Sequence, residues 1–372
     1  SAASDVYKRQ QQYGYYSEGE SFTIADPNEI WIMEMIGKGP GIRGAVWVAV
    51  RVPDDCISAH ANQSRIHQFD MNDKENCMYS PDVVSFAREK GYFNGVNKDF
   101  SFSLAYAPLD FGARRFCEAR VWSYFNKFTD NGKDYLPYIE GKTNTPMPLF
   151  VKPKHKLSVQ DVKDMMRDHY EGTPLDISND FGAGPYKTPY RLSPLNFKVD
   201  GQEYFNERPI STQQSGFVFV AQMRAHKPDP IGGVLWFGVD DANMAVFTPV
   251  YCCATKVPVC YTRVDGADYI TFSWNSAFWI FNWVSNMVYP RYDLMIGDVR
   301  EAQKEMETTF NNAQEGIEEM AAKLLAKDKN AAVDFLTNYT NMTAQSTFDT
   351  WKQLGTFLIV KYNDGAVSYT HL

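Results

Sequence analysis

Residues 29–52 read EIWIMEMIGKGPGIRGAVWVAVRV, and this stretch decides the fold class. Two runs rich in tryptophan, isoleucine, methionine and valine flank a loop at 37–44 that contains four glycines and a proline. Aromatic and β-branched residues bounded by turn formers are typical of strands. A further short run at 22–25 ends in Asp26-Pro27-Asn28, which has the composition of a hairpin turn. The sequence therefore predicts a largely buried antiparallel meander at this end of the chain.

Helical patterns follow the meander. We expect a helix between Ser80 and Gly91, because serine caps helices, the next residue is a proline suited to the first turn, and glycine ends helices. A second helix is predicted over 113–128. A third is predicted to start at Ser158, which forms a capping box with Asp161.

A second strand-rich region extends from 216 to 251. Its apolar runs lie at 216–221, 233–237 and 244–247. Because these runs do not alternate with polar residues, the sequence predicts three strands covered on both faces.

The chain after Trp274 has a helical pattern, which Pro290 interrupts and which ends with a long helix over 331–362. An apolar stripe with helical spacing indicates a packing face rather than a cofactor site; it comprises Ile296, Val299, Ala302, Met306, Phe310, Ala313, Ile317, Met320 and Leu324. We find no internal repeat or low-complexity linker. The sequence therefore predicts one compact α+β unit in which helices cover sheet.

The composition argues against several function classes. The chain has 372 residues, 44% of them hydrophobic and 15% aromatic, with a net charge of −8. This acidic balance argues against nucleic-acid binding, and no apolar run is long enough to predict a membrane span. The six cysteines and six histidines have no metal-site or CxxC spacing, and the sequence lacks GxSxG, P-loop and dinucleotide fingerprints. The residues alone therefore predict no metal and no cofactor.

The two ends of the chain, 1–10 and 367–372, have an unusual relation to each other. Back-translating Asp5 to Gln10 as GAT GTG TAT AAG AGA CAG gives a reverse complement that encodes Val367 to His371 in a shifted frame. One DNA element in two orientations accounts for both ends, and it resembles the adapter of transposase-based sequencing libraries. We therefore expect 11–366 to be an internal piece of a longer reading frame, and we exclude the ends from fold reasoning.

Two segments carry candidate functional residues. At the exit of the strand that ends near residue 52, Asn62 could donate its amide N–H to a developing oxyanion, or it could be an ordinary turn residue. Arg115 and Arg120 lie on the helix predicted over 113–128, about 140° apart around its axis. One could face a pocket and bind a carboxylate while the other pairs with an acid, or both could form surface ion pairs.

The sequence resembles the cysteine dipeptidases of the peptidase D type over essentially all of 11–366. The segments that carry the resemblance are 13–21, 29–34, 51–55, 61–66, 115–122, 167–174, 236–238 and 249–251. The resemblance implies an N-terminal-nucleophile hydrolase with a four-layer αββα core, incomplete at its N-terminus. Residues 11–270 would form the mixed catalytic core, and 271–366 its helical C-terminal part.

The resemblance also implies the chemistry. A cysteine at the mature N-terminus would attack the peptide bond of a dipeptide, with its own α-amine as the base. This cysteine would lie upstream of residue 11, so the 372-residue chain is expected to be inactive. Asn62 matches the oxyanion asparagine, and Arg115 matches an arginine that follows it on a helix. Arg120 is a close second to Arg115, and Arg208 is a weaker alternative.

Other interpretations remain open from the sequence. The chain could be another N-terminal-nucleophile amidase, such as a bile-salt or penicillin amidase, or a non-catalytic aromatic-rich binding module. We expect a short peptide as the partner, neither nucleic acid nor membrane, and a homo-oligomer is compatible with the sequence.

Overall fold

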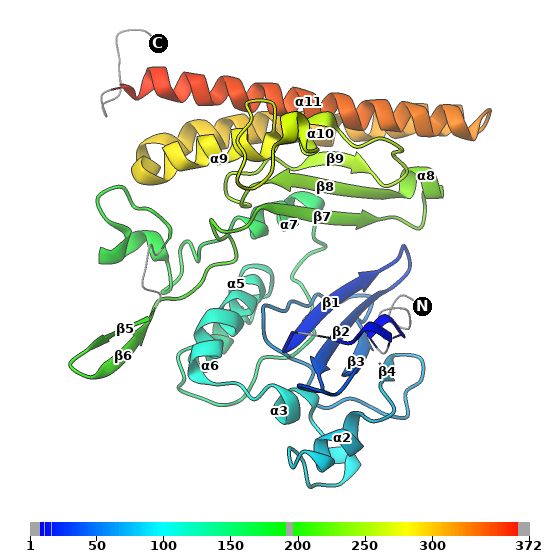
Figure 1. The fold of residues 1–372 in the computed structure, drawn as a ribbon, viewed down its shortest axis with the longest axis vertical. Helices are drawn as coiled ribbons and strands as arrows, with labels where there is room; N and C mark the ends of the chain where they lie inside the picture. The colour runs from blue at the N-terminus through cyan, green and yellow to red at the C-terminus, as the bar shows by residue number, and fades with distance from the viewer. Residues whose placement is uncertain (1–7, 11, 16, 191–195, 364–372) are drawn as a thin grey trace. The chain divides into compact units, whose positions relative to one another are not determined.

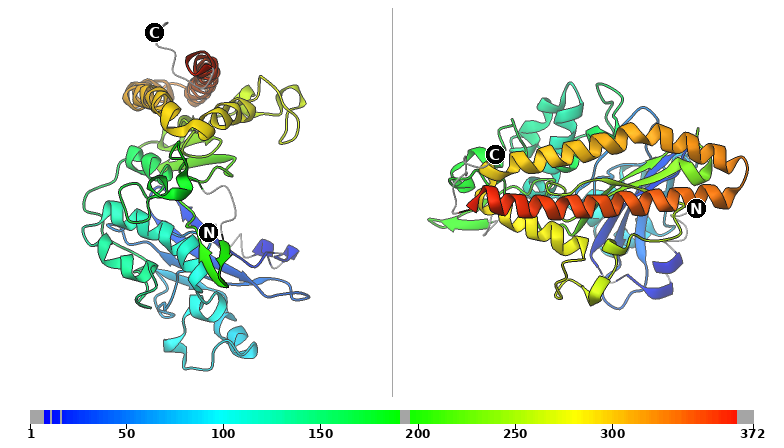
Figure 2. Two further views of the ribbon diagram at one scale, coloured as in Figure 1. Left: turned by 90° about the vertical axis from the view of Figure 1, so that its left-hand side faces the viewer. Right: turned by 90° about the horizontal axis from the view of Figure 1, so that it is seen from above.

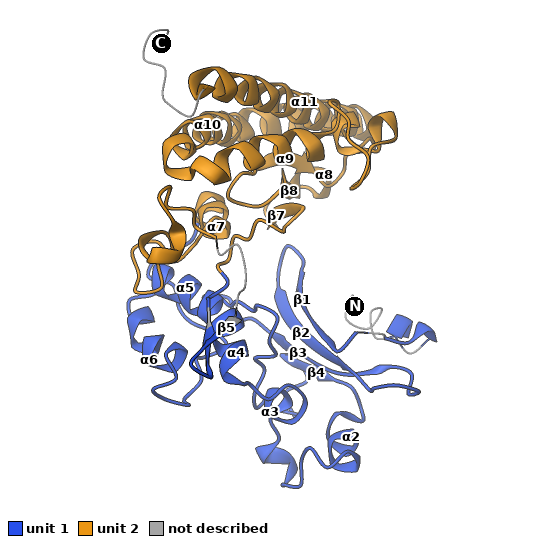
Figure 3. Cartoon of the chain, turned by 60° about the vertical axis from the view of Figure 1, so that its left-hand side comes forward, with its two compact units in different colours: residues 1–157, 195–208 blue, residues 158–194, 209–372 orange. Residues whose placement is uncertain are grey.

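The computed structural model describes residues 8–10, 12–15, 17–190 and 196–363. The chain divides into two compact units (Figure 3), of which unit 1 comprises Ser1–Leu157 with Leu195–Arg208 and unit 2 comprises Ser158–Pro194 with Pro209–Leu372. The boundary expected near residue 270 stays a prediction. Within unit 2, the C-terminal helices share one core with the second β region.

The antiparallel meander predicted at the start of the chain is present in unit 1 (Figure 1). Its strands, in spatial order, are β1 (Gly19–Ala25), β2 (Ile30–Gly37), β3 (Ala45–Arg51) and β4 (Cys77–Tyr79). Asp26-Pro27-Asn28 makes the predicted turn, because the Asp26 carboxylate accepts the N–H groups of Asn28 and Glu29. The register places Glu34 of β2 opposite Val48 of β3.

Both faces of the central strands are buried, as the meander predicts. Val46, Val48 and Val50 of β3 belong to a core that includes helix α2 (Val83–Glu89) and helix α3 (Phe102–Tyr106). The alternate residues, including Trp47, pack with Trp31, Met33 and Met35 in a second cluster. Helix α2 begins later than the sequence predicts, because the Ser80 hydroxyl accepts the N–H of Trp47 instead of capping the helix.

The helix predicted over 113–128 is present but is not regular. It consists of α4 (Phe111–Ala113), a π-helical turn (Arg114–Glu118) and α5 (Ala119–Phe128). The Asp110 carboxylate caps its start by accepting the N–H of Ala113 at 2.6 Å. Single π-helical turns inside α-helices are frequent at functional sites. Unit 1 also contains α6 (Leu136–Ile139) and the hairpin of β5 (Asn196–Val199) and β6 (Gln202–Phe205).

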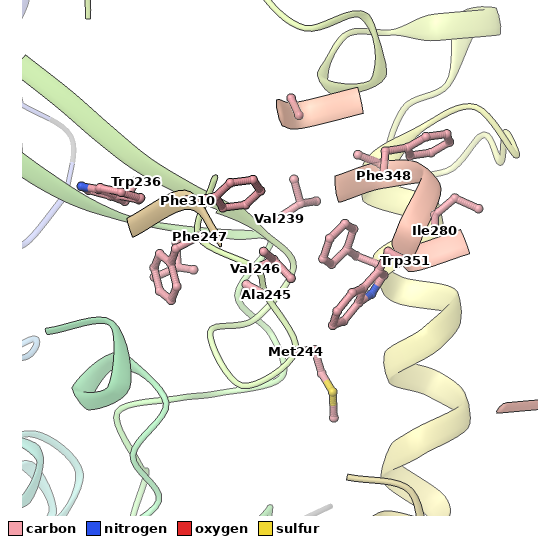
Figure 4. Packing of buried hydrophobic residues seen from close by; sticks show 14 of the residues in the cluster. Trp236, Val239, Met244, Ala245, Val246, Phe247, Ile280, Phe310, Phe348 and Trp351 are labelled. Carbon is pink, nitrogen blue, oxygen red and sulfur yellow. The ribbon is translucent and has the colours of Figure 1, made fainter. Parts of the chain in front are cut away.

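Unit 2 begins with α7 (Val159–Met166), whose predicted capping box between Ser158 and Asp161 is confirmed. Its sheet has the order β7 (Phe217–Met223), β8 (Gly233–Val239) and β9 (Thr248–Tyr251), and the short helix α8 (Asp229–Gly232) precedes β8. The prediction of a strand at 244–247 is wrong. The Asp241 carboxylate accepts the N–H groups of Asn243 and Met244 and holds a turn there. The run is apolar because it is buried in the core (Figure 4).

The prediction that the strands of this second sheet are covered on both faces is also wrong for β7. Val218 and Val220 are buried, whereas the side chains between them alternate outward, with Phe217 61% and Phe219 50% exposed. An alternating pattern of this kind means that one face of the strand is packed and the other is open.

Three helices complete unit 2, and their boundaries agree with the sequence analysis. They are α9 (Ala277–Val288), α10 (Tyr292–Leu325) and α11 (Lys329–Lys361), with Pro290 in the break between the first two. Helices α10 and α11 run side by side (Figure 2). Phe281 of α9 stacks on Trp351 of α11 at 4.8 Å between ring centroids, in the same cluster as Trp236 of β8. None of the helices described combines the length and hydrophobicity needed to cross a bilayer.

Candidate active site

Asn62 lies in unit 1, in the irregular segment that follows β3. Its backbone has a φ of 56°, in the left-handed region that asparagine tolerates better than most residues. Its side chain is exposed. The residue therefore occupies a turn, as the interpretation of Asn62 as an ordinary turn residue requires. Its amide is also accessible to a ligand, as the interpretation as an oxyanion donor requires.

Arg120 of α5 binds the Asn62 side chain. Its Nη2 donates to Asn62 Oδ1 at 2.8 Å, and its Nε donates to the Phe116 carbonyl at 2.7 Å. A guanidinium group can only donate hydrogen bonds, so the amide oxygen must face Arg120 and Nδ2 must point the other way. Among the residues that the structure describes, no acceptor binds this Nδ2. Arg120 thus presents Asn62 as a free N–H donor.

Arg115 has different partners, as the angle between the two arginines on the helix suggests. It forms an ion pair with Glu207 and donates from Nη1 to the Ile139 carbonyl at 3.1 Å. Within the described ranges it makes no hydrogen bond to Asn62 or Arg120. The structure therefore brings Asn62 and Arg120 together and leaves Arg115 in a partly buried ion pair.

Arg208, the weaker alternative, lies in the same part of unit 1 as Arg120. Both arginines oppose the rise that burial causes in the pKa of Cys117, which places their charges in one neighbourhood. Cys117 is next to Glu118 in the π-helical turn. This part of unit 1 consequently combines two guanidinium groups with an exposed amide donor.

Three buried charged residues beside Asn62 were not singled out from the sequence. Glu34 of β2 is 1% exposed, and its carboxylate accepts hydrogen bonds from Ser64 and from the backbone of Arg65 and Ile66. Burial raises the pKa of the Glu34 carboxyl, against the effect of these hydrogen bonds. Arg65 in turn donates from Nε to Glu118 at 2.9 Å. A sequence signal for Glu34 exists, since it is a charged residue within a strand of otherwise apolar residues.

Comparison with known proteins identifies the family of the chain. The sequence model of peptidase family C69 matches residues 7–305. The chain belongs to peptidase family C69. It is 31% identical over 235 residues to a probable dipeptidase of Salmonella dublin, covering 63% of this chain and 47% of that protein.

Two further relatives give a similar result. A probable dipeptidase of Latilactobacillus sakei is 26% identical, covering 74% of this chain and 51% of its own length. Dipeptidase A of Lactobacillus helveticus is 23% identical, with 73% and 49% covered. The chain thus spans about half the length of these curated relatives.

None of the six cysteines of this C69 chain has the properties of an activated nucleophile. A reactive cysteine needs a lowered pKa, since the thiolate is the attacking species. Burial instead raises the pKa of every one of them, to about 11 for Cys77 and Cys260. The remaining four are Cys56, Cys117, Cys252 and Cys253.

A small cavity adjoins the Asn62 segment. Gln63, Ser64, Arg65, His67, Ser103 and Glu118 are among the residues that line it, and its volume is about 20 Å³. A space of this size holds about one water molecule. The cavity is therefore too small for a dipeptide.

Unit 2 of the C69 chain buries a separate set of charged groups. Arg167, in the segment that carries the dipeptidase resemblance, forms an ion pair with Glu307 at 2.5 Å. Asp241 accepts a hydrogen bond from the Tyr289 hydroxyl at 2.6 Å. Burial and the neighbouring charge of Asp241 raise the pKa of Asp240 to about 7. These groups connect α7, the β8–β9 turn and α10 within one unit.

Proposed function

We propose that this C69 chain is part of a dipeptidase whose nucleophile is an N-terminal cysteine encoded upstream of residue 11. The family and the names of its relatives support the substrate class. The observation that carries the proposal for this chain is the Asn62 amide, which Arg120 orients so that its N–H group is free to donate.

The proposed reaction proceeds through a covalent acyl-enzyme. The cysteine sulfur attacks the peptide carbonyl carbon, and the α-amine of the cysteine accepts the thiol proton. The carbonyl oxygen becomes an oxyanion, to which Asn62 Nδ2 donates a hydrogen bond. The C–N bond then breaks, and the leaving amine takes up the proton. Water hydrolyses the resulting thioester and regenerates the thiol.

The arginines have separate roles in this proposal. Arg120 orients Asn62, and Arg208 supplies a second positive charge nearby that suits a substrate carboxylate. Arg115 is already neutralised by Glu207. We therefore assign it to holding the β5–β6 segment against the helix rather than to binding substrate.

The proposed fold is the four-layer αββα core of N-terminal-nucleophile hydrolases. Each unit contains an antiparallel sheet with helices packed against one face, as half of such a core requires. The open face of β7 is available to further layers.

A direct test compares two proteins, the 372-residue product and the reading frame recovered from neighbouring genomic sequence. We expect dipeptide hydrolysis only from the longer protein, and only while its N-terminal cysteine is intact. Penicillin V and a conjugated bile salt serve as competing substrates. Turnover of dipeptides by the 372-residue chain would refute the placement of the nucleophile, and preference for either competing substrate would refute the substrate class.

A further inference from the structure

We propose that Glu34 is a positioning residue that sets the place of the Asn62 side chain. This inference rests on the proposed function, since it concerns how the oxyanion donor is held. Glu34 lies 28 positions before Asn62 and on a different element, the strand β2. It does not contact Asn62 itself but binds the residues that follow it.

The Glu34 carboxylate takes three donors from one short segment. Oε1 accepts the backbone N–H of Arg65 at 2.6 Å. Oε2 accepts the Ser64 hydroxyl at 2.5 Å and the backbone N–H of Ile66 at 3.1 Å. An irregular segment has no strand partner to satisfy its N–H groups, so Glu34 supplies the acceptors that a sheet would otherwise provide.

The Arg65 side chain extends this attachment to both sides of Asn62. Its Nη1 donates to the carbonyl of Ala59, which precedes Asn62, at 3.0 Å. Its Nε donates to Glu118 in the π-helical turn of the helix that carries Arg120. The backbone of Arg65 is held by Glu34. One continuous set of bonds therefore joins β2, the Asn62 segment and the helix that orients the Asn62 amide.

The charge of Glu34 has no evident purpose in folding alone. Its neighbours on β2 are apolar, and among the described residues no cation lies within ion-pair distance of its carboxylate; the charge of Arg65 acts on it only from further away. Burying a carboxylate without an ion-pair partner costs free energy, which an apolar side chain at the same position would not. A carboxylate is nevertheless what a segment with three converging donors requires. The arrangement is thus explained by the need to hold this segment in one conformation.

Hydrogen exchange tests the attachment in the 372-residue chain, without any need for activity. In Glu34→Gln, one carboxylate oxygen becomes an NH₂ group, so at least one of the two backbone N–H groups loses its acceptor. We expect exchange of the Arg65 and Ile66 amides to accelerate by about tenfold or more. Ser64→Ala removes one donor and leaves the charge, and it should produce a smaller change in the same direction.

A matched control is Glu318→Gln in unit 2. Glu318 is 2% exposed, so the variant also loses a buried carboxylate, but its partners Arg224 and Lys227 form a separate network within unit 2. We expect no change in the exchange of residues 63–66. If Glu34→Gln does not fold, Ser64→Ala decides the question by the same measurement. If Glu34→Gln folds and the exchange of its Arg65 and Ile66 amides is unchanged, the proposal is overturned. If Glu34→Gln does not fold, unchanged exchange of the same amides in Ser64→Ala overturns it.

A double-mutant cycle in the active longer protein then separates positioning from general destabilisation. Glu34→Gln should lower kcat by about 10- to 100-fold and leave KM unchanged, since misplaced catalytic groups have effects of this size. In an Asn62→Gly background the same substitution should have no further effect on kcat, because the group that it positions is gone. Equal effects in both backgrounds would overturn the role of Glu34. An unchanged kcat in Asn62→Gly alone would instead overturn the proposed function of Asn62.

Discussion

Substitution of Asn62 gives the sharpest prediction for this protein, because its side-chain oxygen and nitrogen have different functions in the proposal. The oxygen accepts the Arg120 hydrogen bond at 2.8 Å, and the nitrogen is the proposed oxyanion donor. Asn62→Asp keeps the first interaction and removes the second. Its carboxylate would form an ion pair with Arg120, and it has no N–H group at neutral pH.

Asn62→Asp should raise the free energy of unfolding slightly and lower kcat strongly. The new ion pair is exposed, so it should raise the free energy of unfolding by at most about 1 kcal/mol. Loss of one oxyanion donor should lower kcat by about 10²–10³-fold, which corresponds to about 3–4 kcal/mol. Asn62→Asp should therefore be at least as stable as the parent chain while it loses catalysis.

The backbone at Asn62 supplies a matched pair of controls. Asn62→Ala and Asn62→Gly both remove the amide and should lower kcat equally. At a φ of 56°, however, alanine costs about 1 kcal/mol that glycine does not, so Asn62→Ala should be less stable. We would measure urea unfolding in the 372-residue chain and dipeptide hydrolysis in the longer active protein. A kcat of Asn62→Asp close to that of the parent enzyme would refute the oxyanion role.

Three further predictions concern unit 2. The pKa of Asp240 is raised to about 7, so the folded state favours its neutral form. The free energy of unfolding that this preference contributes is present at low pH and is lost as pH rises through about 7. Asp240→Asn should therefore raise the Tm more at pH 8 than at pH 5. Glu307→Ala leaves Arg167 buried with only the exposed Asp164 carboxylate as an ion-pair partner. Urea titration should show that the free energy of unfolding falls by about 3–5 kcal/mol, and a fall below about 1 kcal/mol would contradict this. Gly355→Ala places a Cβ 2.2 Å from the Trp283 ring. The overpacking should lower the free energy of unfolding by about 1–3 kcal/mol, and with it the Tm. Gly316→Ala on α10 has open space around its Cβ and should raise the Tm.

Much of the secondary structure could be predicted from local sequence. The meander at 19–51, the capped start of α7 at Ser158 and the long C-terminal helices depend on turn formers, capping residues and periodic apolar positions. These are interactions within a few residues of each other, so their signals are visible in the chain itself. The same reasoning failed at 244–247, where apolar character reflects burial of a turn.

The error at 244–247 has a specific physical cause. Met244 and Phe247 are fully buried because α9, α10 and α11 pack over that turn with the sheet. Burial requires apolar side chains in any backbone conformation, so it does not distinguish a strand from a turn. The backbone there is determined by the Asp241 carboxylate, which takes the N–H groups that a strand partner would bind.

The sequence by itself determined that Asn62 is a candidate donor and that Arg115 and Arg120 point in different directions from one helix. Only the tertiary structure decided that Arg120, 58 positions away, binds the Asn62 oxygen and that Arg115 pairs with Glu207. It also revealed Glu34, whose three hydrogen bonds cross about 30 positions of sequence. Such contacts depend on chain segments that meet only after the sheet and helix have packed, and no local pattern in the sequence records which donor will face which acceptor.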